Sequence, residues 1–215
     1  MPWPHTRTKE CRHVSESEYK SDALRAKEKL GSVSPTMCLA KWNQTSLHLP
    51  TGLTNSCYHP PLHQIDAEAV KSNPAALHNT KEKLEQRQQM LSGDKPAGCS
   101  YCWNIEKTGE MSDRHYRSGE PWAMQDFENI RNNPIDDKHT PRYVEVNFNN
   151  ACNLKCSYCS PQFSTTWGKE VERYGEYPTS PPHNAPEHFQ GRRRPIPNRE
   201  ENPYVTAFWK WWPTL

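Results

Sequence analysis

Three cysteines, Cys152, Cys156 and Cys159, follow one another with the spacing C-x3-C-x2-C. Thiolates are soft ligands that suit iron–sulfur clusters. Three of them on one short loop can hold three corners of a four-iron cluster and leave the fourth iron without a protein ligand. Because an open iron can bind and activate a small molecule, the spacing predicts a reactive cluster and not only an electron carrier. A structural zinc site or three unrelated thiols remain as alternatives.

Four further cysteines form a second candidate metal site. Cys38 and Cys57 fit the pattern C-x13-G-x4-C through Gly52, and Cys99 and Cys102 form a C-x2-C pair. We expect a β-hairpin to supply the first pair and a knuckle after a helix to supply the second, so that a metal centre would tie distant segments together. Paired thiolates suit an iron–sulfur cluster and tetrahedral zinc alike, and both interpretations stay open.

The composition shows why a metal centre would matter for stability. Only 33% of the 215 residues are hydrophobic, 20 are proline, and the mean hydropathy is −1.06. So little apolar material predicts reliance on metal centres, partners or further sequence. With a net charge of +2 we expect no nucleic-acid or membrane surface. The eighth cysteine, Cys11, has no partner by spacing and is predicted to be a spare thiol.

The amino-terminal half of the chain contains four predicted elements. Residues 17–30 could form a charged helix with a thin apolar stripe of Tyr19, Leu24 and Leu30. Residues 37–42 and 46–49 are typical of two short strands. The clearest helix spans 74–91, with Asn73 as its N-cap, Pro74 at its first position and Gly93 after its end. Leu77, Leu84 and Leu91 are expected to form its packed face.

The carboxyl-terminal half contains the elements that must position the three-cysteine loop. A helix is predicted over 121–131, with Trp122, Phe127 and Ile130 on its packed side. Residues 143–148 form a β-branched and aromatic strand that leads directly into the loop, and 164–174 form the helix after it. Residues 178–203 hold seven prolines and are expected to be a linker. The aromatic residues Phe208, Trp209, Trp211 and Trp212 are expected to pack against something beyond this chain.

The segment Asn150-Ala151-Cys152-Asn153-Leu154-Lys155-Cys156-Ser157-Tyr158-Cys159 resembles the cluster loop of the radical S-adenosylmethionine (radical SAM) enzymes. The resemblance implies that the three cysteines ligate a [4Fe-4S] cluster, that its open iron binds S-adenosylmethionine, and that Tyr158 lies against the adenine. It also implies an enzyme that generates a 5′-deoxyadenosyl radical for hydrogen abstraction from a substrate. No residue is assigned as a catalytic acid, base or nucleophile.

The other four cysteines resemble the auxiliary-cluster modules called SPASM and twitch, which accompany many radical SAM enzymes. The resemblance implies that Cys38, Cys57, Cys99 and Cys102 ligate a second, auxiliary [4Fe-4S] cluster, with four ligands as in the shorter twitch form. Glu106, Gly109, Ser112 and Arg114 follow the C-x2-C pair in an arrangement associated with these modules. A plain surface loop is the alternative for these four residues.

The expected fold class is α/β, or α+β overall. A polar segment at 1–35 precedes a hairpin-and-helix auxiliary module at 36–120, and a linker with a helix covers 121–140. The first βα unit of an incomplete radical SAM (β/α) barrel is expected at 141–215. The missing later strands predict that the chain is an amino-terminal portion of a longer enzyme.

The expected partners follow from the same resemblance. They are a peptide or protein substrate and an electron donor such as a flavodoxin or ferredoxin, with no membrane and no nucleic acid. Cysteine-rich sequence without a secretory signal predicts a cytoplasmic location, where thiols stay reduced. The rival interpretations are a non-catalytic zinc-binding scaffold and a truncated, inactive protein.

Overall fold

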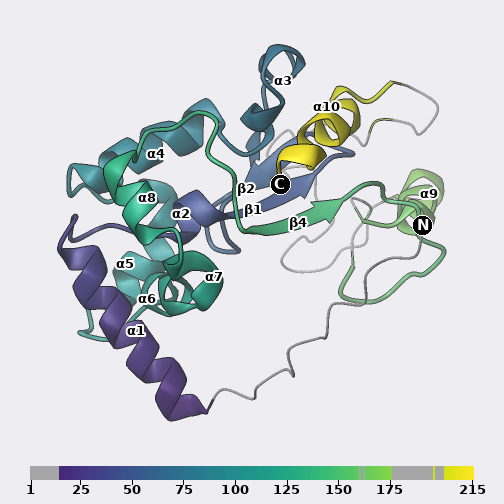
Figure 1. Ribbon diagram of the computed structural model, residues 1–215. Helices are drawn as coiled ribbons and strands as arrows, with labels where there is room; N and C mark the ends of the chain where they lie inside the picture. Colours follow the sequence, from purple (N-terminus) through teal and green to yellow (C-terminus); the bar gives the residue numbers. More distant parts are fainter. Residues whose placement is uncertain (1–14, 160, 162, 176–195, 197–200) are drawn as a thin grey trace, which may run out of the picture.

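The structure, a computed structural model, describes residues 15–159, 161, 163–175, 196 and 201–215. These residues form a mixed α/β fold around one small sheet, with helices on both sides of it (Figure 1). The strands are β1 Gln44–His48, β2 Leu53–Asn55, β3 His63–Gln64 and β4 Tyr143–Asn147. Their order is β3-β2-β1-β4, and β4 runs parallel to β1 while the other pairs are antiparallel.

Most of the described chain is helical. The longer helices are α1 Glu16–Gly31, α4 Lys81–Leu91, α9 Thr165–Tyr174 and α10 Pro203–Trp211. The shorter ones are α2 Ala40–Asn43, α3 Ala69–Ser72, α5 Ser100–Glu106, α6 Asp113–Gly119, α7 Pro121–Met124 and α8 Phe127–Asn132. Short 3-10 turns complete the set: η1 Pro74–Leu77, η2 Ala97–Cys99 and η4 Trp212–Thr214.

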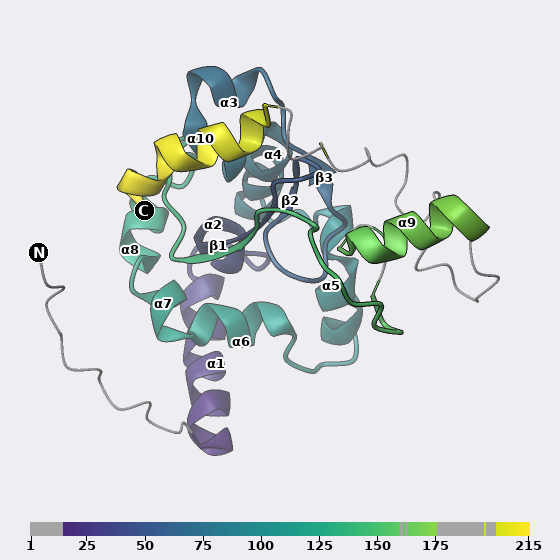
Figure 2. The same ribbon diagram turned by 90° about the vertical axis from the view of Figure 1, so that its right-hand side faces the viewer.

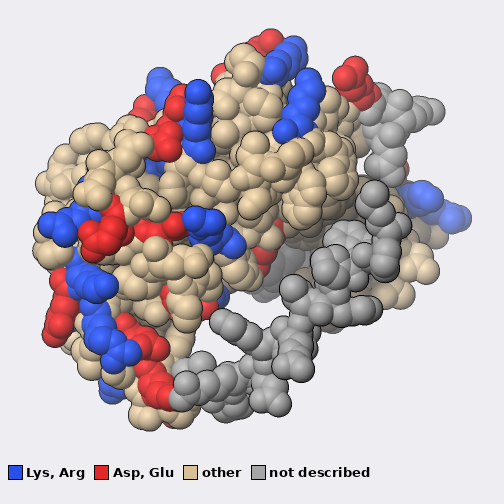
Figure 3. Space-filling model, viewed as in Figure 1, with Lys and Arg blue, Asp and Glu red and all other residues tan. Residues whose placement is uncertain are grey.

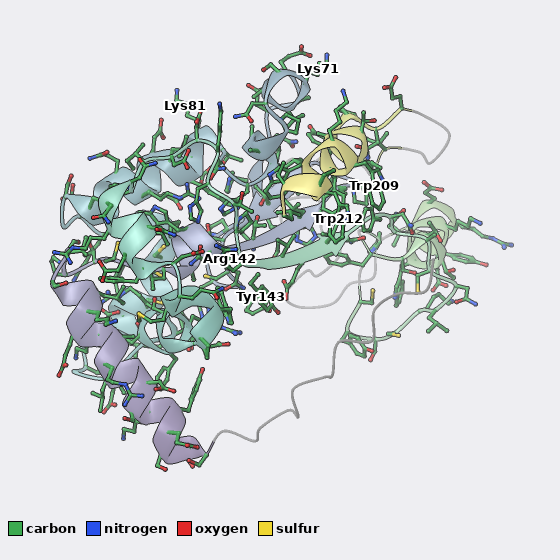
Figure 4. The ribbon with its side chains drawn as sticks, viewed as in Figure 1. Lys71, Lys81, Arg142, Tyr143, Trp209 and Trp212 are labelled. Carbon is green, nitrogen blue, oxygen red and sulfur yellow. The ribbon has the colours of Figure 1, made fainter. Side chains whose placement is uncertain are left out.

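The two faces of the sheet differ in chemistry because side chains alternate along a strand. Leu47 of β1 and Val144 and Val146 of β4 belong to one face and pack in an apolar cluster under α10, η1 and α3. Figure 2 shows α10 lying across this side of the sheet. The opposite face carries polar residues, which include Ser46 opposite Glu145 and His48 opposite Asn147. Figure 4 shows Tyr143 of β4 on the side away from α10, as this alternation requires.

A second core lies among the helices at the amino-terminal end of β1. It joins Leu30 of α1, Trp42 of α2, Met90 of α4 and Phe127 of α8, and it includes the buried cysteines Cys38, Cys99 and Cys102. The described residues thus divide their apolar material between two clusters that share the sheet. The pairing of β4 with β1 joins the predicted auxiliary module to the predicted start of the catalytic core within a single sheet.

The strand predicted at 37–42 is wrong, because residues 40–43 form α2. Lys41 N–H and Trp42 N–H donate to the carbonyl oxygens of Cys38 and Leu39, at 3.0 Å each, and these local bonds turn the chain before β1 begins. The next strand is confirmed, although it begins two residues earlier than predicted, at Gln44.

The helix predicted at 74–91 is two elements, η1 and α4, with His78, Asn79 and Thr80 between them. Asn73 caps η1 as predicted, but Thr80 caps α4 by accepting from Lys83 N–H at 3.2 Å. His78 leaves the helix to contact the Trp42 carbonyl through Nε2, at 2.6 Å. The predicted packed face is confirmed in part: Leu77 is 0% exposed and Leu91 packs against a core cluster, but the buried positions of α4 are Lys83, Arg87 and Met90.

Two other helix predictions are confirmed in part. The helix at 17–30 exists as α1, but it buries Ala23, Ala26 and Leu30, while Tyr19 and Leu24 are 41% and 48% exposed. Small alanines let α1 pack closely on α6. The helix at 121–131 is split into α7 and α8, which bury Phe127 and Ile130 as predicted.

The carboxyl-terminal elements follow the prediction more closely. Strand β4 and helix α9 lie where the sequence placed them, and Ser164 caps α9 by accepting from Trp167 N–H at 3.2 Å. Most of the proline-rich linker and Cys11 lie outside the described residues. The final aromatic segment lies in α10 and η4. The expectation that it packs beyond the chain is wrong for Phe208 and Trp211, which are buried in the apolar cluster on the sheet, whereas Trp209 and Trp212 are each 56% exposed. Figure 3 shows an uncharged surface over α10, where Figure 4 labels the two exposed tryptophans.

Candidate metal sites

The structure brings four of the predicted ligands together around one cavity. Cys38, Cys57, Cys99 and Cys102 all line it, although they lie as much as 64 positions apart in the sequence. Three of the four thiols are buried, and all four are free. We call this space the four-thiol cavity. Lys41, Ser56, Tyr58, Trp103, Arg114 and Arg117 are among its other lining residues.

Cys99 and Cys102 reach the cavity from the start of α5. Residues three apart on a helix share one face, so the C-x2-C spacing points both thiols in the same direction. Trp103 fixes the helix start by donating its indole N–H to the Pro96 carbonyl at 3.0 Å. Cys99 and Cys102 can therefore reach the same cavity although only two residues separate them in the sequence.

Cys38 and Cys57 enter from the two ends of the β1–β2 hairpin, and Gly52 shapes its turn. Gly52 has a φ of +67°, in the left-handed region that favours glycine. A Cβ atom at this position would lie 2.2 Å from the ring of Tyr204 in α10. The glycine of the C-x13-G-x4-C pattern is therefore needed both for the turn and for the close approach of α10.

Burial keeps the thiols of Cys38, Cys57 and Cys102 protonated when no metal is bound. It raises the pKa of Cys57 to about 12 and that of Cys102 to about 11, and the neighbouring Cys38 thiol adds to both shifts. The pKa of Cys38 is also raised, first by burial and then by Cys99. A metal that binds here must displace protons from these thiols, so its affinity rises with pH.

Three basic residues are buried in this part of the fold, and one of them, Lys41, lines the four-thiol cavity. Lys41, Lys83 and Arg87 are 2%, 0% and 0% exposed, and no described carboxylate forms an ion pair with any of them. Lys83 Nζ donates to the hydroxyls of Thr45 and Thr54, at 2.8 and 3.1 Å, and burial lowers its pKa well below the usual value. Uncompensated buried cations are costly, so this region is suited to an anion.

Arg114 adds a paired cation to the cavity wall. Its guanidinium holds Glu106 through two hydrogen bonds of 2.9 and 2.8 Å and donates to the Met37 carbonyl at 2.7 Å. Ser112 Oγ also donates to Glu106, at 2.6 Å. The alternative of a surface loop is wrong for these residues, because Arg114 is 6% exposed and Ser112 is 1% exposed. Arg114 and Glu106 thus hold the segment after Cys102 next to Met37, the residue before Cys38.

The three-cysteine loop lies between β4 and α9, at the carboxyl end of β4, whereas α2 and α5 lie toward the opposite end of the strands (Figure 1). Cys152, Cys156 and Cys159 are free and partly exposed. Cys159 N–H donates to the Cys156 carbonyl at 3.0 Å, which forms a tight turn between the last two thiols.

The first turn of α9 holds this loop by its backbone. The hydroxyls of Thr165 and Thr166 donate to the Cys152 carbonyl at 3.1 and 2.9 Å, and the indole N–H of Trp167 donates to the Cys156 carbonyl at 3.0 Å. Ser164 Oγ donates to the Leu154 carbonyl at 2.7 Å. The contacts from α9 therefore use main-chain oxygens of the loop, while within the loop Leu154 N–H donates to Cys152 Sγ at 3.5 Å.

Tyr158 is 85% exposed, and its phenol lies beside the Cys156 thiol. A hydrogen bond with the Cys156 thiol raises the pKa of its phenol. Open space therefore surrounds the side chain for which a contact with adenine is predicted.

The thiols of neither set converge on a single point. Within the described residues, no group of three or more Cys, His, Asp or Glu side chains is arranged to hold a metal ion. The buried residues that sequence reasoning missed are Lys41, Lys83, Arg87 and Ser56. Ser56 Oγ is buried in the cavity wall and has no hydrogen-bond partner in the described structure.

Comparisons of this chain with family models, curated proteins and solved structures give no match. In the part of the chain that the structure describes, no helix has the length and apolar character needed to cross a membrane. The fold and the two cysteine sites therefore carry the functional argument.

Proposed function

We propose that this chain is part of a radical SAM enzyme, with a [4Fe-4S] cluster on Cys152, Cys156 and Cys159 and an auxiliary cluster on the other four cysteines. One observation carries the proposal: the three thiols lie on a single accessible loop whose backbone is held by α9. Such a loop supplies three ligands and leaves the fourth iron open. When bound, the cluster would supply the electron that cleaves S-adenosylmethionine.

The residues of the loop fit the cluster in their chemistry. The donors of α9 occupy the carbonyls of Cys152, Leu154 and Cys156, so that α9 keeps the loop in shape through main-chain oxygens. The phenol of Tyr158 is free to turn toward a bound nucleoside. These residues bind and orient; we assign none of them to a proton transfer.

The four-thiol cavity fits an anionic cluster for two reasons. Four thiolates around a [4Fe-4S]²⁺ core carry a net charge of −2, which Lys41 in the cavity wall and Lys83, close enough to interact with Cys57, would partly compensate. Ser56 Oγ, buried and unpartnered, could donate to a sulfur in the cavity.

The proposed partners are a peptide or protein substrate and a flavodoxin or ferredoxin as the electron donor. Auxiliary clusters accompany peptide-modifying members of the family that the sequence resembles. The finer fold assignment, a twitch-like module before the first unit of a radical SAM barrel, belongs to the same proposal.

Iron and acid-labile sulfide per chain, measured after anaerobic reconstitution, test the proposal first. We expect about eight irons, equal to two four-iron clusters. Cys156→Ala and Cys99→Ala should each remove about four. Added S-adenosylmethionine should change the electron paramagnetic resonance spectrum of the parent chain and of Cys99→Ala. It should not change the spectrum of Cys156→Ala, which lacks the cluster of the three-cysteine loop.

Other outcomes would overturn the proposal in different ways. Stoichiometric zinc and no iron would favour the non-catalytic scaffold. If S-adenosylmethionine still perturbs the spectrum of Cys156→Ala, the three-cysteine loop does not bind it.

A further inference from the structure

The polar face of the sheet contains a second cavity, which the cluster sites do not use. It has a volume of about 310 Å³ and is lined by residues of β1, β2 and β4 together with Tyr58 and Phe163. We call it the sheet groove. Tyr58 also lines the four-thiol cavity, and Phe163 follows the three-cysteine loop. The groove therefore runs between the two cysteine sites, and its volume lies within the range of small-molecule sites.

Glu145 provides the charge of the groove. Its carboxylate accepts hydrogen bonds from the hydroxyls of Tyr58 at 2.5 Å, Ser46 at 2.7 Å and Tyr143 at 3.0 Å. These neutral donors stabilise the ionised form, and the pKa of Glu145 is lowered although partial burial opposes this. Among the described residues no cation forms an ion pair with it. The nearby Arg117 pairs instead with Glu120, at 2.9 Å.

Asn55 gives a second, independent sign of a missing ligand. It lies opposite Ser46 in the β1–β2 pairing and lines the groove. The residue is 9% exposed, and its Oδ1 is buried without a hydrogen-bond partner in the described structure. An unmade hydrogen bond at a buried acceptor costs about 1–3 kcal/mol. A ligand that donates a hydrogen bond to Asn55 Oδ1 would therefore be bound favourably.

The walls of the groove favour a flat or elongated cation. Phe163 lies with its ring 5.8 Å from that of His48, and Tyr58 closes the other end. Aromatic faces attract cations, and a carboxylate binds a guanidinium through paired hydrogen bonds.

We propose that the sheet groove binds a small organic cation with several N–H donors, such as a guanidinium or an alkylammonium, which pairs with Glu145 and donates to Asn55. Its place between the two cysteine sites makes it a candidate for the charged group of a substrate. The inference does not depend on whether either cysteine site holds iron.

The test uses two probes of the same shape and different charge, butylguanidinium and butylurea. Each is titrated into the full chain, prepared anaerobically, while amide chemical shifts are followed by nuclear magnetic resonance. We expect butylguanidinium to shift the amides of β1, β2 and β4 and to bind at least tenfold more tightly than butylurea. Equal binding of the two probes, or no binding of butylguanidinium, would overturn the proposal.

Variants then locate the binding site. Glu145→Gln should weaken butylguanidinium binding about tenfold, and Asn55→Leu should weaken it by a smaller factor. Glu68→Gln is the matched control, because it removes the same charge from an exposed side chain outside the groove, and it should bind the probe as the parent chain does. Unchanged binding by a folded Glu145→Gln variant, checked by circular dichroism, would show that the cation lies elsewhere.

Discussion

The two cysteine sites differ in how they are built. The four-thiol cavity collects its thiols from a hairpin and a helix, buries three of the four, and has Lys41, Arg114 and Arg117 in its wall. The three-cysteine loop takes its ligands from eight consecutive residues and is held by one turn of α9. The first site therefore depends on the whole fold, whereas the second depends on a local contact. Each of the following experiments tests that difference.

The largest effect is expected from Cys38→Ser compared with Cys156→Ser. Loss of a ligand in the four-thiol cavity should lower the free energy of unfolding of the reconstituted protein by several kcal/mol, on the order of 5, because metal binding there is coupled to folding. Cys156→Ser should change it by less than about 1 kcal/mol. Denaturant titration of both iron-loaded variants measures this. Equal losses would mean that the loop also supports the fold.

Acid should weaken the fold through its buried histidines. Burial lowers the pKa of His63 to about 3 and those of His115 and His139 to about 4, so they stay neutral in the folded state. The unfolded chain takes up protons below pH 6.5, and stability is lost as the pH falls from there toward 4. The slope approaches about 1.4 kcal/mol per pH unit for each such histidine. Denaturant titrations between pH 7 and 4.5 measure this slope, and His63→Gln should flatten it.

Lys83→Met tests the charge argument for the four-thiol cavity. In the metal-free protein it should raise the free energy of unfolding by about 1–2 kcal/mol, because it removes a buried and unpaired cation. In the reconstituted protein this gain should disappear, and iron should be lost to a chelator faster than from the parent chain. Lys81→Met is the matched control, since the Lys81 side chain on the same helix is 91% exposed and projects into solvent (Figure 4). The same gain in both metal states would contradict an anionic occupant.

The smallest effect is expected at Ser164, which caps α9 and also holds the Leu154 carbonyl. Ser164→Ala should cost about 1 kcal/mol locally. Amide hydrogen exchange should speed up between residues 150 and 167 and stay unchanged in α4 and α5. A matching loss of protection in those helices would show that the two sites are not independent.

The same difference explains what could be predicted from the sequence. The β4–loop–α9 unit was predictable because its signals are local: a β-branched strand, three closely spaced cysteines and a serine cap. The gathering of Cys38, Cys57, Cys99 and Cys102 also followed from spacing, since thiols at these intervals suit one centre.

The surroundings of the four-thiol cavity could not be predicted in this way. The polar residues Lys83 and Arg87 are typical of an exposed helix face, yet they form the buried face of α4. No periodicity reveals a buried charge whose hydrogen-bond partners come from distant segments, as Thr45 and Thr54 do for Lys83. The break at His78 had the same origin, because its contact with Trp42 lies 36 positions away. The polar face of the sheet was likewise hidden until β4 was placed beside β1.

The parallel pairing of β1 with β4 has a consequence for biosynthesis. All residues of the four-thiol cavity precede position 118, whereas β4 begins at Tyr143. As the chain leaves the ribosome, the hairpin and α5 can meet before the strand that completes the sheet has been made, since folding during synthesis begins with the N-terminal part. Until then the outer edge of β1 has no neighbour and is open to wrong pairings. Early metal insertion at the first site would shorten that vulnerable interval, so the supply of iron during translation would govern how much of the protein matures correctly.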